Sequence, residues 1–180
     1  MPSLARLRDL ALVAVAAGAL VLAAPALAKV FSSGNLSKKI PEVGLAKSKI
    51  EVTKRGQVSD VNVEIRASHT YTCDLIVGVQ GPGSNDQFIE LMDDHCDGND
   101  DDDLGTGSKS CAGEGTVFDD EAATAIGDGM NPYAGSFAPE ESLDSYDDGR
   151  AKGTWTLYVF DINQSDSGTL HCWKLNVKTA

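Results

Sequence analysis

Apolar and polar residues alternate with a period of two along most of the chain after residue 30, a pattern that predicts β-strands. It is clearest in two runs near the end of the chain, GTWTLYVFD and GTLHCWKLNV. The segment 163–168 between them, NQSDSG, is rich in residues that form turns. We therefore predict a β-hairpin over Gly153–Val177, with Trp155 and Trp173 on facing strands and packed in the core.

Earlier segments follow the same pattern. In VSDVNVEIRASHTY, residues 58–71, the apolar face carries Val61, Val63 and Ile65, and the polar face carries Asn62, Glu64 and Arg66. No helical periodicity of useful length occurs after residue 28, and at most one helical turn is expected, at 121–126. Turn residues separate the short alternating runs, and no repeat or linker divides them. The pattern predicts one all-β domain, a jelly-roll-like β-sandwich.

The first 28 residues differ from the rest. Arg6 and Arg8 precede an apolar run from Leu10 to Leu22, and the small-residue segment APALA ends at Ala28. This organisation is typical of a secretory signal peptide. The apolar run is short for a membrane span, which needs about 20 residues. We predict a signal peptide at 1–28 and an exported domain at 29–180, secreted or periplasmic and without a membrane anchor after cleavage.

The net charge of the chain limits the kinds of partner that it can bind. It has 15 basic and 27 acidic side chains, a net charge of −12. Removing residues 1–28 takes away two Arg and one Asp, which leaves 13 basic and 26 acidic groups and a charge of −13. Such a surface repels nucleic acid and anionic lipid, so cations or basic partners are favoured.

Six segments carry a family resemblance. In chain order they are FSSGNLSKKIPEVGLAKSKIEV, VSDVNVEIRASHTY, DLIVGVQGPGS, TVFDDE, AGSFAPEESL, and the closing pair GTWTLYVFD and DSGTLHCWKL. Together they resemble the P domain (P/Homo B domain), the β-sandwich that follows the catalytic domain in subtilisin-like proprotein convertases and related secreted bacterial proteases. The resemblance implies a domain that packs on a subtilisin-like catalytic domain, stabilises it and tunes its response to Ca²⁺ and pH.

Catalytic motifs are missing from the sequence. It contains no Gly-x-Ser-x-Gly turn, no HExxH and no Cys-x-x-Cys, and His69, His95 and His171 are isolated. We therefore expect no catalytic residues here and no required cofactor, with a separate subtilisin-like protease or another exported protein as partner. Serine-type endopeptidase activity would belong to a catalytic domain elsewhere. The alternative is a free-standing, Ca²⁺-dependent lectin-like or adhesion module.

The loop Asp93–Cys111 is unusually acidic, and neutralisation by Ca²⁺ would relieve its repulsion. Its spacing does not match an EF-hand, and a solvated acidic loop is the alternative. Asp119 and Asp120 either bind the same ion or hold their own loop by accepting backbone N–H bonds. The metal candidates are Asp97, Asp100, Asp101, Asp102, Asp103, Asp119 and Asp120.

Four cysteines follow the predicted signal peptide, and an even number in an oxidising compartment predicts two disulfides. Cys96 and Cys111 bracket one polar loop, so we expect them to pair, which leaves Cys73 for Cys172. The second pair needs a bulge or a strand end, because Cys172 lies on the face opposite Trp173. Free buried thiols are the alternative.

Overall fold

The alternating segments form strands in the computed structural model, which describes residues 27–83, 87–95, 103–106 and 109–180. Eleven strands occur in these ranges: β1 Lys29–Ser32, β2 Lys38–Ile40, β3 Gly44–Val52, β4 Val58–His69, β5 Leu75–Gln80, β6 Phe88–Asp93, β7 Asp103–Leu104, β8 Thr116–Phe118, β9 Gly135–Phe137, β10 Gly153–Asp161 and β11 Gly168–Thr179. Three short 3-10 helices join them: η1 Thr72–Asp74, η2 Ile126–Asp128 and η3 Leu143–Tyr146. The all-β prediction is confirmed.

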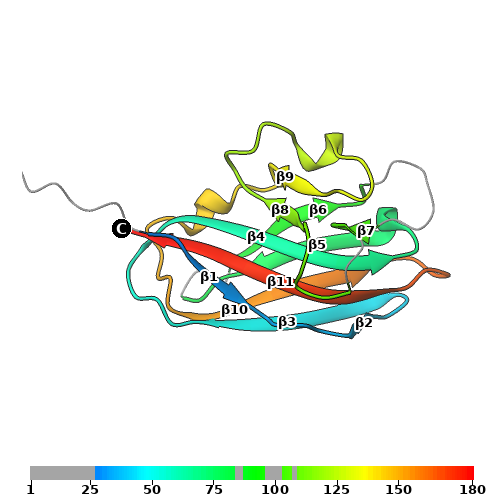
Figure 1. Ribbon diagram of the computed structural model, residues 1–180, viewed down its shortest axis with the longest axis horizontal. Coiled ribbons are helices and arrows are strands. Elements are labelled where there is room, and N and C mark those ends of the chain that lie inside the picture. Colours follow the sequence, from blue (N-terminus) through cyan, green and yellow to red (C-terminus); the bar gives the residue numbers. More distant parts are fainter. Residues whose placement is uncertain (1–26, 84–86, 96–102, 107–108) are drawn as a thin grey trace, which may run out of the picture.

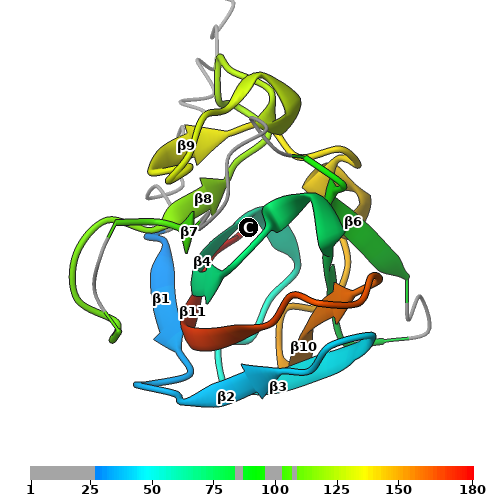
Figure 2. The same ribbon diagram turned by 90° about the vertical axis from the view of Figure 1, so that its right-hand side faces the viewer.

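The strands form a sandwich of two sheets (Figure 1). Sheet A has the order β1-β11-β4-β8-β9, with β2 also paired to β11 and β7 to β4. Sheet B has the order β3-β10-β5-β6. The named pairs are antiparallel except β8 and β9, which run parallel. In Figure 2, β8 and β9 carry sheet A away from β3 and β10.

The predicted hairpin over Gly153–Val177 is wrong in its pairing. Both strands exist, but β10 pairs with β3 and β5 in sheet B, whereas β11 pairs with β1, β2 and β4 in sheet A. The turn at 163–168 therefore crosses from one sheet to the other. Because each strand finds partners from distant segments, both become central strands, and their two apolar faces meet across the core.

The core lies where the apolar faces of the two sheets meet. Trp155 and Trp173 are both 0% exposed, as predicted. The indole N–H of Trp155 donates to Ala151 O at 3.0 Å. The indole N–H of Trp173, in sheet A, donates to Ser48 Oγ of sheet B at 2.9 Å. Each buried indole thus keeps a hydrogen bond, and the second one links the sheets.

A bulge interrupts the pairing of β4 and β11 between Leu170 and Cys172. It inserts His171, so that Leu170 and Trp173 both face the core although two residues separate them. Within the described ranges no helix is long and apolar enough to cross a membrane. Most of the predicted signal peptide, residues 1–26, lies outside the described residues.

Candidate functional site

The acidic loop proposed for calcium falls largely outside the described residues, which exclude Asp97, Asp100, Asp101 and Asp102. Asp103 is described. It pairs with Ser68 across β7 and β4, and its backbone N–H donates to Asn131 Oδ1 at 3.1 Å. Among the residues described, no three His, Cys, Asp or Glu side chains lie close enough to hold an ion. The calcium site stays a prediction for the acidic run.

The other two metal candidates accept hydrogen bonds, Asp119 within its own loop and Asp120 from the start of η3. The carboxylate of Asp120 accepts hydrogen bonds from Ser142 Oγ at 2.8 Å and from the backbone N–H groups of the next two residues at 3.1 and 2.8 Å. Asp119 Oδ1 accepts the N–H of Glu121 at 3.1 Å. Asp120 thus binds N–H groups at the start of η3, as a helix cap does. Of the two roles considered for this pair, the structure shows the backbone hydrogen bonds.

The expected disulfide pairing is wrong. Cys111 is bonded to Cys172, 61 positions along the chain, so neither a Cys96–Cys111 nor a Cys73–Cys172 bridge is present. Cys73 is also disulfide-bonded, and Cys96 lies outside the described residues. The bond holds Cys111 against β11, where Cys172 lies outside the core cluster. Two cysteines that are close in the sequence are therefore not necessarily the two that bond.

The bulge in β11 brings together two side chains that lie 103 positions apart in sequence. His171 Nε2 lies 2.9 Å from Ser68 Oγ. Both residues line a small pocket of about 60 Å³ with Arg66, Asp103 and Lys109. Burial lowers the pKa of His171; Asp103 raises this pKa, and Lys109 and Arg66 lower it. A neutral His171 can accept the hydroxyl proton of Ser68.

A serine–histidine pair needs N–H donors for the developing oxyanion before it can catalyse acyl transfer. The backbone N–H groups of Gly105 and Thr106, in the pocket wall, already donate to Pro132 O at 2.7 Å and Glu114 O at 2.9 Å. These two groups therefore cannot form an oxyanion hole without breaking their bonds. The spacing of Ser68 and His171 in the sequence could not have revealed their contact, because it depends on the pairing of β4 with β11.

His69 forms a second buried pair, with Asp161. Their side chains are 1% and 0% exposed, and Nε2 of the histidine lies 3.2 Å from Oδ2 of the aspartate. Nδ1 of the same ring lies 2.7 Å from Tyr71 O. The pair joins the end of β4 in sheet A to the end of β10 in sheet B. Its place in the core indicates that it stabilises the fold.

The outer face of sheet B carries an aromatic patch, defined here as Phe88, Tyr158 and Phe160. The ring centroid of Phe88 lies 5.6 Å from that of Tyr158 and 6.2 Å from that of Phe160, both edge to face. Phe88 can lie flat on the sheet because Gly78 is beneath it; a Cβ there would be 2.1 Å from the ring. Lys47 Nζ lies 4.9 Å from the Tyr158 centroid. The three half-buried rings are typical of a protein contact surface.

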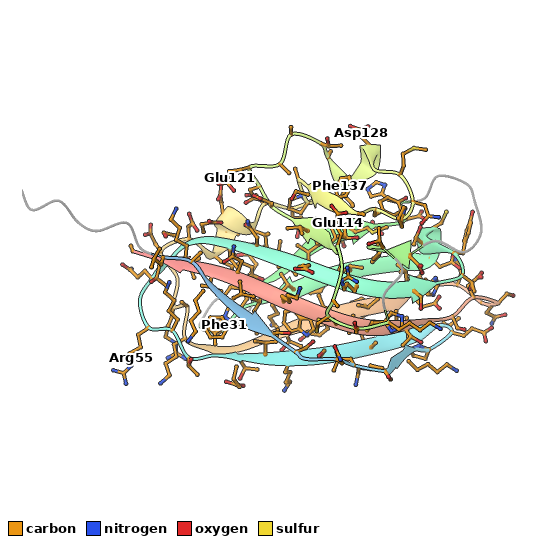
Figure 3. The ribbon with its side chains drawn as sticks, viewed as in Figure 1. Phe31, Arg55, Glu114, Glu121, Asp128 and Phe137 are labelled. Carbon is orange, nitrogen blue, oxygen red and sulfur yellow. A yellow bond between two sulfur atoms is a disulfide. The ribbon has the colours of Figure 1, made fainter. Side chains whose placement is uncertain are left out.

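One end of the sandwich has a pocket of about 290 Å³ beside η3, lined by Tyr146, Asp147, Asp148 and Trp155 among others. Its wall is aromatic, since the rings of Tyr146 and Trp155 lie 4.9 Å apart. Its rim is acidic. Burial and neighbouring carboxylates raise the pKa of Asp147, and the same two causes raise the pKa of Asp60 nearby. Outside this pocket, Figure 3 shows the acidic side chains Glu121 and Asp128 on the connection between β8 and β9.

Comparison with known proteins supports the family resemblance for part of the chain. Residues 131–177 match the proprotein convertase P-domain, so the resemblance is confirmed over that span. These residues include β9, η3, β10 and most of β11. None of the curated proteins matches the chain.

Two solved structures are similar. One is the crystal structure of a serine protease of Aeromonas sobria, with a TM-score of 0.52 and 13% identity; the match covers 88% of this chain and 28% of that one. The other is the crystal structure of the A. sobria serine protease in complex with the chaperone ORF2, with a TM-score of 0.46, 15% identity, and coverage of 86% and 28%. The chain thus spans 28% of the length of each protein. The first likeness supports the fold.

Proposed function

We propose that this chain is an exported, non-catalytic P-domain module that stabilises or regulates a separate subtilisin-like protease or another exported protein. The observation that carries the proposal is the P-domain match over 131–177. These residues form β10 and β11, the strands to which most others pair. The signal-peptide pattern of residues 1–28 supports export.

The aromatic patch is the surface we assign to the partner. Aromatic side chains supply much of the binding energy in protein interfaces, and rings already held in place lose little entropy on binding. Gly78 and the neighbouring rings hold Phe88, and Lys47 covers one side of Tyr158. The double variant Y158S/F160S is expected to weaken partner binding by at least about tenfold, since each ring is a candidate hot spot.

Photo-crosslinking from position 158 in the exported protein identifies the partner. The purified partner protease is then heated with and without this chain, and its loss of activity is followed over time. We expect the wild-type chain to lengthen the half-life and Y158S/F160S to lose the effect. A variant on the opposite face, N62V/N176V, is the matched control and keeps it. An unchanged half-life and unchanged protease activity with the wild-type chain would contradict the proposal.

The proposal also requires that the purified chain does not hydrolyse casein or peptide substrates. S68A and H171A are the control variants of this test, because Ser68 and His171 form the serine–histidine contact described above. Hydrolysis that persists through purification and disappears in either S68A or H171A would show that the chain is itself an enzyme.

A further inference from the structure

The outer face of sheet A has a pocket with a different chemistry from the aromatic patch. Its volume is about 210 Å³, and its lining residues are Val30, Asn62, Glu64, Val117, Lys174 and Asn176. They come from β1, β4, β8 and β11, which lie side by side in the sheet (Figure 1). In the strand register Asn62 is opposite Asn176, and Glu64 is opposite Lys174. We call this site the sheet-face pocket.

The two asparagines of the pocket lack the hydrogen bonds that other asparagines make. Oδ1 of Asn62 and Oδ1 of Asn176 are both buried without a partner, although the two residues face each other across the strands. Asn35, Asn131 and Asn163, the other described asparagines, each make a side-chain hydrogen bond. An unpaired buried amide destabilises a fold, and Asn is disfavoured inside strands. Folding therefore does not explain this pair.

The unpaired polar atoms are concentrated on one face. In the described part of the chain, the buried side-chain N and O atoms without a partner are these two oxygens and Nε and Nη2 of Arg66. Arg66 follows Asn62 and Glu64 on the outer side of β4, and its Nε lies 3.8 Å from Glu64 Oε1. Buried polar groups without partners are rare in native proteins. The two asparagines line the sheet-face pocket, whereas Arg66 lines the smaller pocket beside Ser68 and His171. The unpaired asparagine oxygens at the sheet-face pocket point to a ligand there.

The charges of the pocket favour a neutral ligand. Lys174 Nζ lies 2.8 Å from Glu64 Oε1, so the ammonium and the carboxylate neutralise each other. A charged ligand would have to compete with this ion pair. A hydroxyl group can accept from one amide, and it can donate to the other once that amide turns its buried oxygen toward the pocket.

The size and shape of the sheet-face pocket further limit the class of ligand that it can bind. The pocket of about 210 Å³ is smaller than the roughly 300–1,000 Å³ of sites for drug-sized ligands. Val30 and Val117 provide apolar walls at its two sides. Planar polar groups between apolar walls match a sugar ring, whose hydroxyl groups project around its edge and whose C–H groups cover its faces. We propose that the sheet-face pocket binds one sugar ring, either a free monosaccharide or the terminal unit of a glycan, through the amides of Asn62 and Asn176.

This site is distinct from a calcium-dependent site at the loop tips. It lies on the strands, requires no metal and does not depend on the P-domain role. The aromatic patch is on the other sheet, so each surface can be disabled without touching the other.

The test is a titration of ¹⁵N-labelled protein with glucose, galactose, N-acetylglucosamine and their methyl glycosides, with and without calcium, followed by NMR. We expect at least one sugar to shift the side-chain amide signals of Asn62 and Asn176 in a saturable manner, equally in both conditions. Binding of the methyl glycoside as well would identify a glycan end as the occupant, and binding of the free sugar alone would identify a monosaccharide. No saturable shift with any of these sugars, or a shift with sodium acetate alone, would overturn the proposal.

The variant N62V/N176V separates a binding role from a structural one. It is expected to bind the sugar at least about tenfold more weakly, because it loses two hydrogen-bonding amides. It is also expected to have a higher Tm than the wild type, because two buried amide oxygens without a partner are removed. Y158S/F160S is the control and binds the sugar normally. If N62V/N176V does not fold, N176S is measured instead and is expected to bind more weakly; unchanged binding in the folded variant would refute the assignment.

Discussion

Removing the Cys111–Cys172 bond tests the tertiary arrangement directly. The variant C111A/C172A opens a closed loop of 61 positions, for which the chain-entropy relation gives about 4 kcal/mol at 25 °C. In a domain of this size, each kcal/mol changes Tm by about 2–4 °C. We therefore expect the variant to melt roughly 8–16 °C below the wild type. Both cysteines are replaced together so that no unpaired thiol can exchange with another disulfide.

Non-reducing tryptic mapping decides the connectivity, because the sequence separates the cysteines well. Trypsin produces peptide 67–109 with Cys73 and Cys96, peptide 110–150 with Cys111, and peptide 153–174 with Cys172. The structure predicts that 110–150 is linked to 153–174. Cys73 is also disulfide-bonded and Cys96 is the fourth cysteine of the sequence, so by elimination we expect the second bridge within 67–109. A link between 67–109 and 110–150 would refute this arrangement.

The melting temperature of C111A/C172A can also contradict the predicted stabilisation by the disulfide. If mapping finds the expected link but C111A/C172A melts at the wild-type temperature, the bond does not restrict the unfolded chain as the entropy relation assumes. Hydrogen exchange then shows whether the segment 109–115 has opened alone or whether the whole sandwich has weakened.

Three further predictions concern charge and hydrogen bonding. In thermal unfolding, about 1 mM CaCl₂ is expected to raise Tm by several degrees more than NaCl of equal ionic strength, and equal effects would show that the run 97–103 is only a solvated acidic loop. Burial and neighbouring carboxylates raise the pKa of Asp60, so the folded state binds this proton more tightly than the unfolded state and loses stability as the pH rises through the raised pKa. Lys178 lowers this pKa without outweighing burial, so D60N should raise Tm at neutral pH and lose that gain below about pH 3, where the carboxyl is protonated in both states; a gain that is independent of pH would contradict the assignment. Y146F removes a hydroxyl that donates to Val79 O at 2.7 Å and Gln87 O at 2.9 Å, and should lower the free energy of unfolding by about 1–3 kcal/mol in urea titrations, with no change if solvent replaces both bonds.

Local alternation was enough to predict that β4, β10 and β11 form strands and which side of each is buried. Val61, Val63 and Ile65 are at most 3% exposed, as the pattern of β4 required. Arg66 departs from it, because a polar residue on the outer side of β4 is only 2% exposed. Thr106 and Gly113 lie against its side chain, with Thr106 O accepting from Nη1 at 3.3 Å. The alternation of polar and apolar residues along β4 does not show which distant residues will cover the strand.

Candidate sites were harder to predict than strands, because they depend on contacts between distant segments. For Asp119 and Asp120 the sequence left open whether they bind an ion or hold their loop; the bond of Asp119 lies within its own loop, whereas Asp120 bonds to η3, 23 positions along the chain. The Ser68–His171 contact and the Asn62–Asn176 pair could not, because both require the register of β4 against β11. The family resemblance located the domain type and contained no information about these pairs.

The sequence by itself determined the strand-forming segments, their buried faces, the all-β class and the acidic surface, because backbone alternation and charge are properties of neighbouring residues. Only the tertiary structure decided the strand partners, the Cys111–Cys172 bond and the surfaces where ligands could bind. A turn such as 163–168 can return its strand to the same sheet or carry it across the core with little difference in local energy. The choice depends on the partners that each strand finds: β10 pairs with β3 and β11 pairs with β4, both about a hundred residues away, and these pairings exist only in the assembled sandwich.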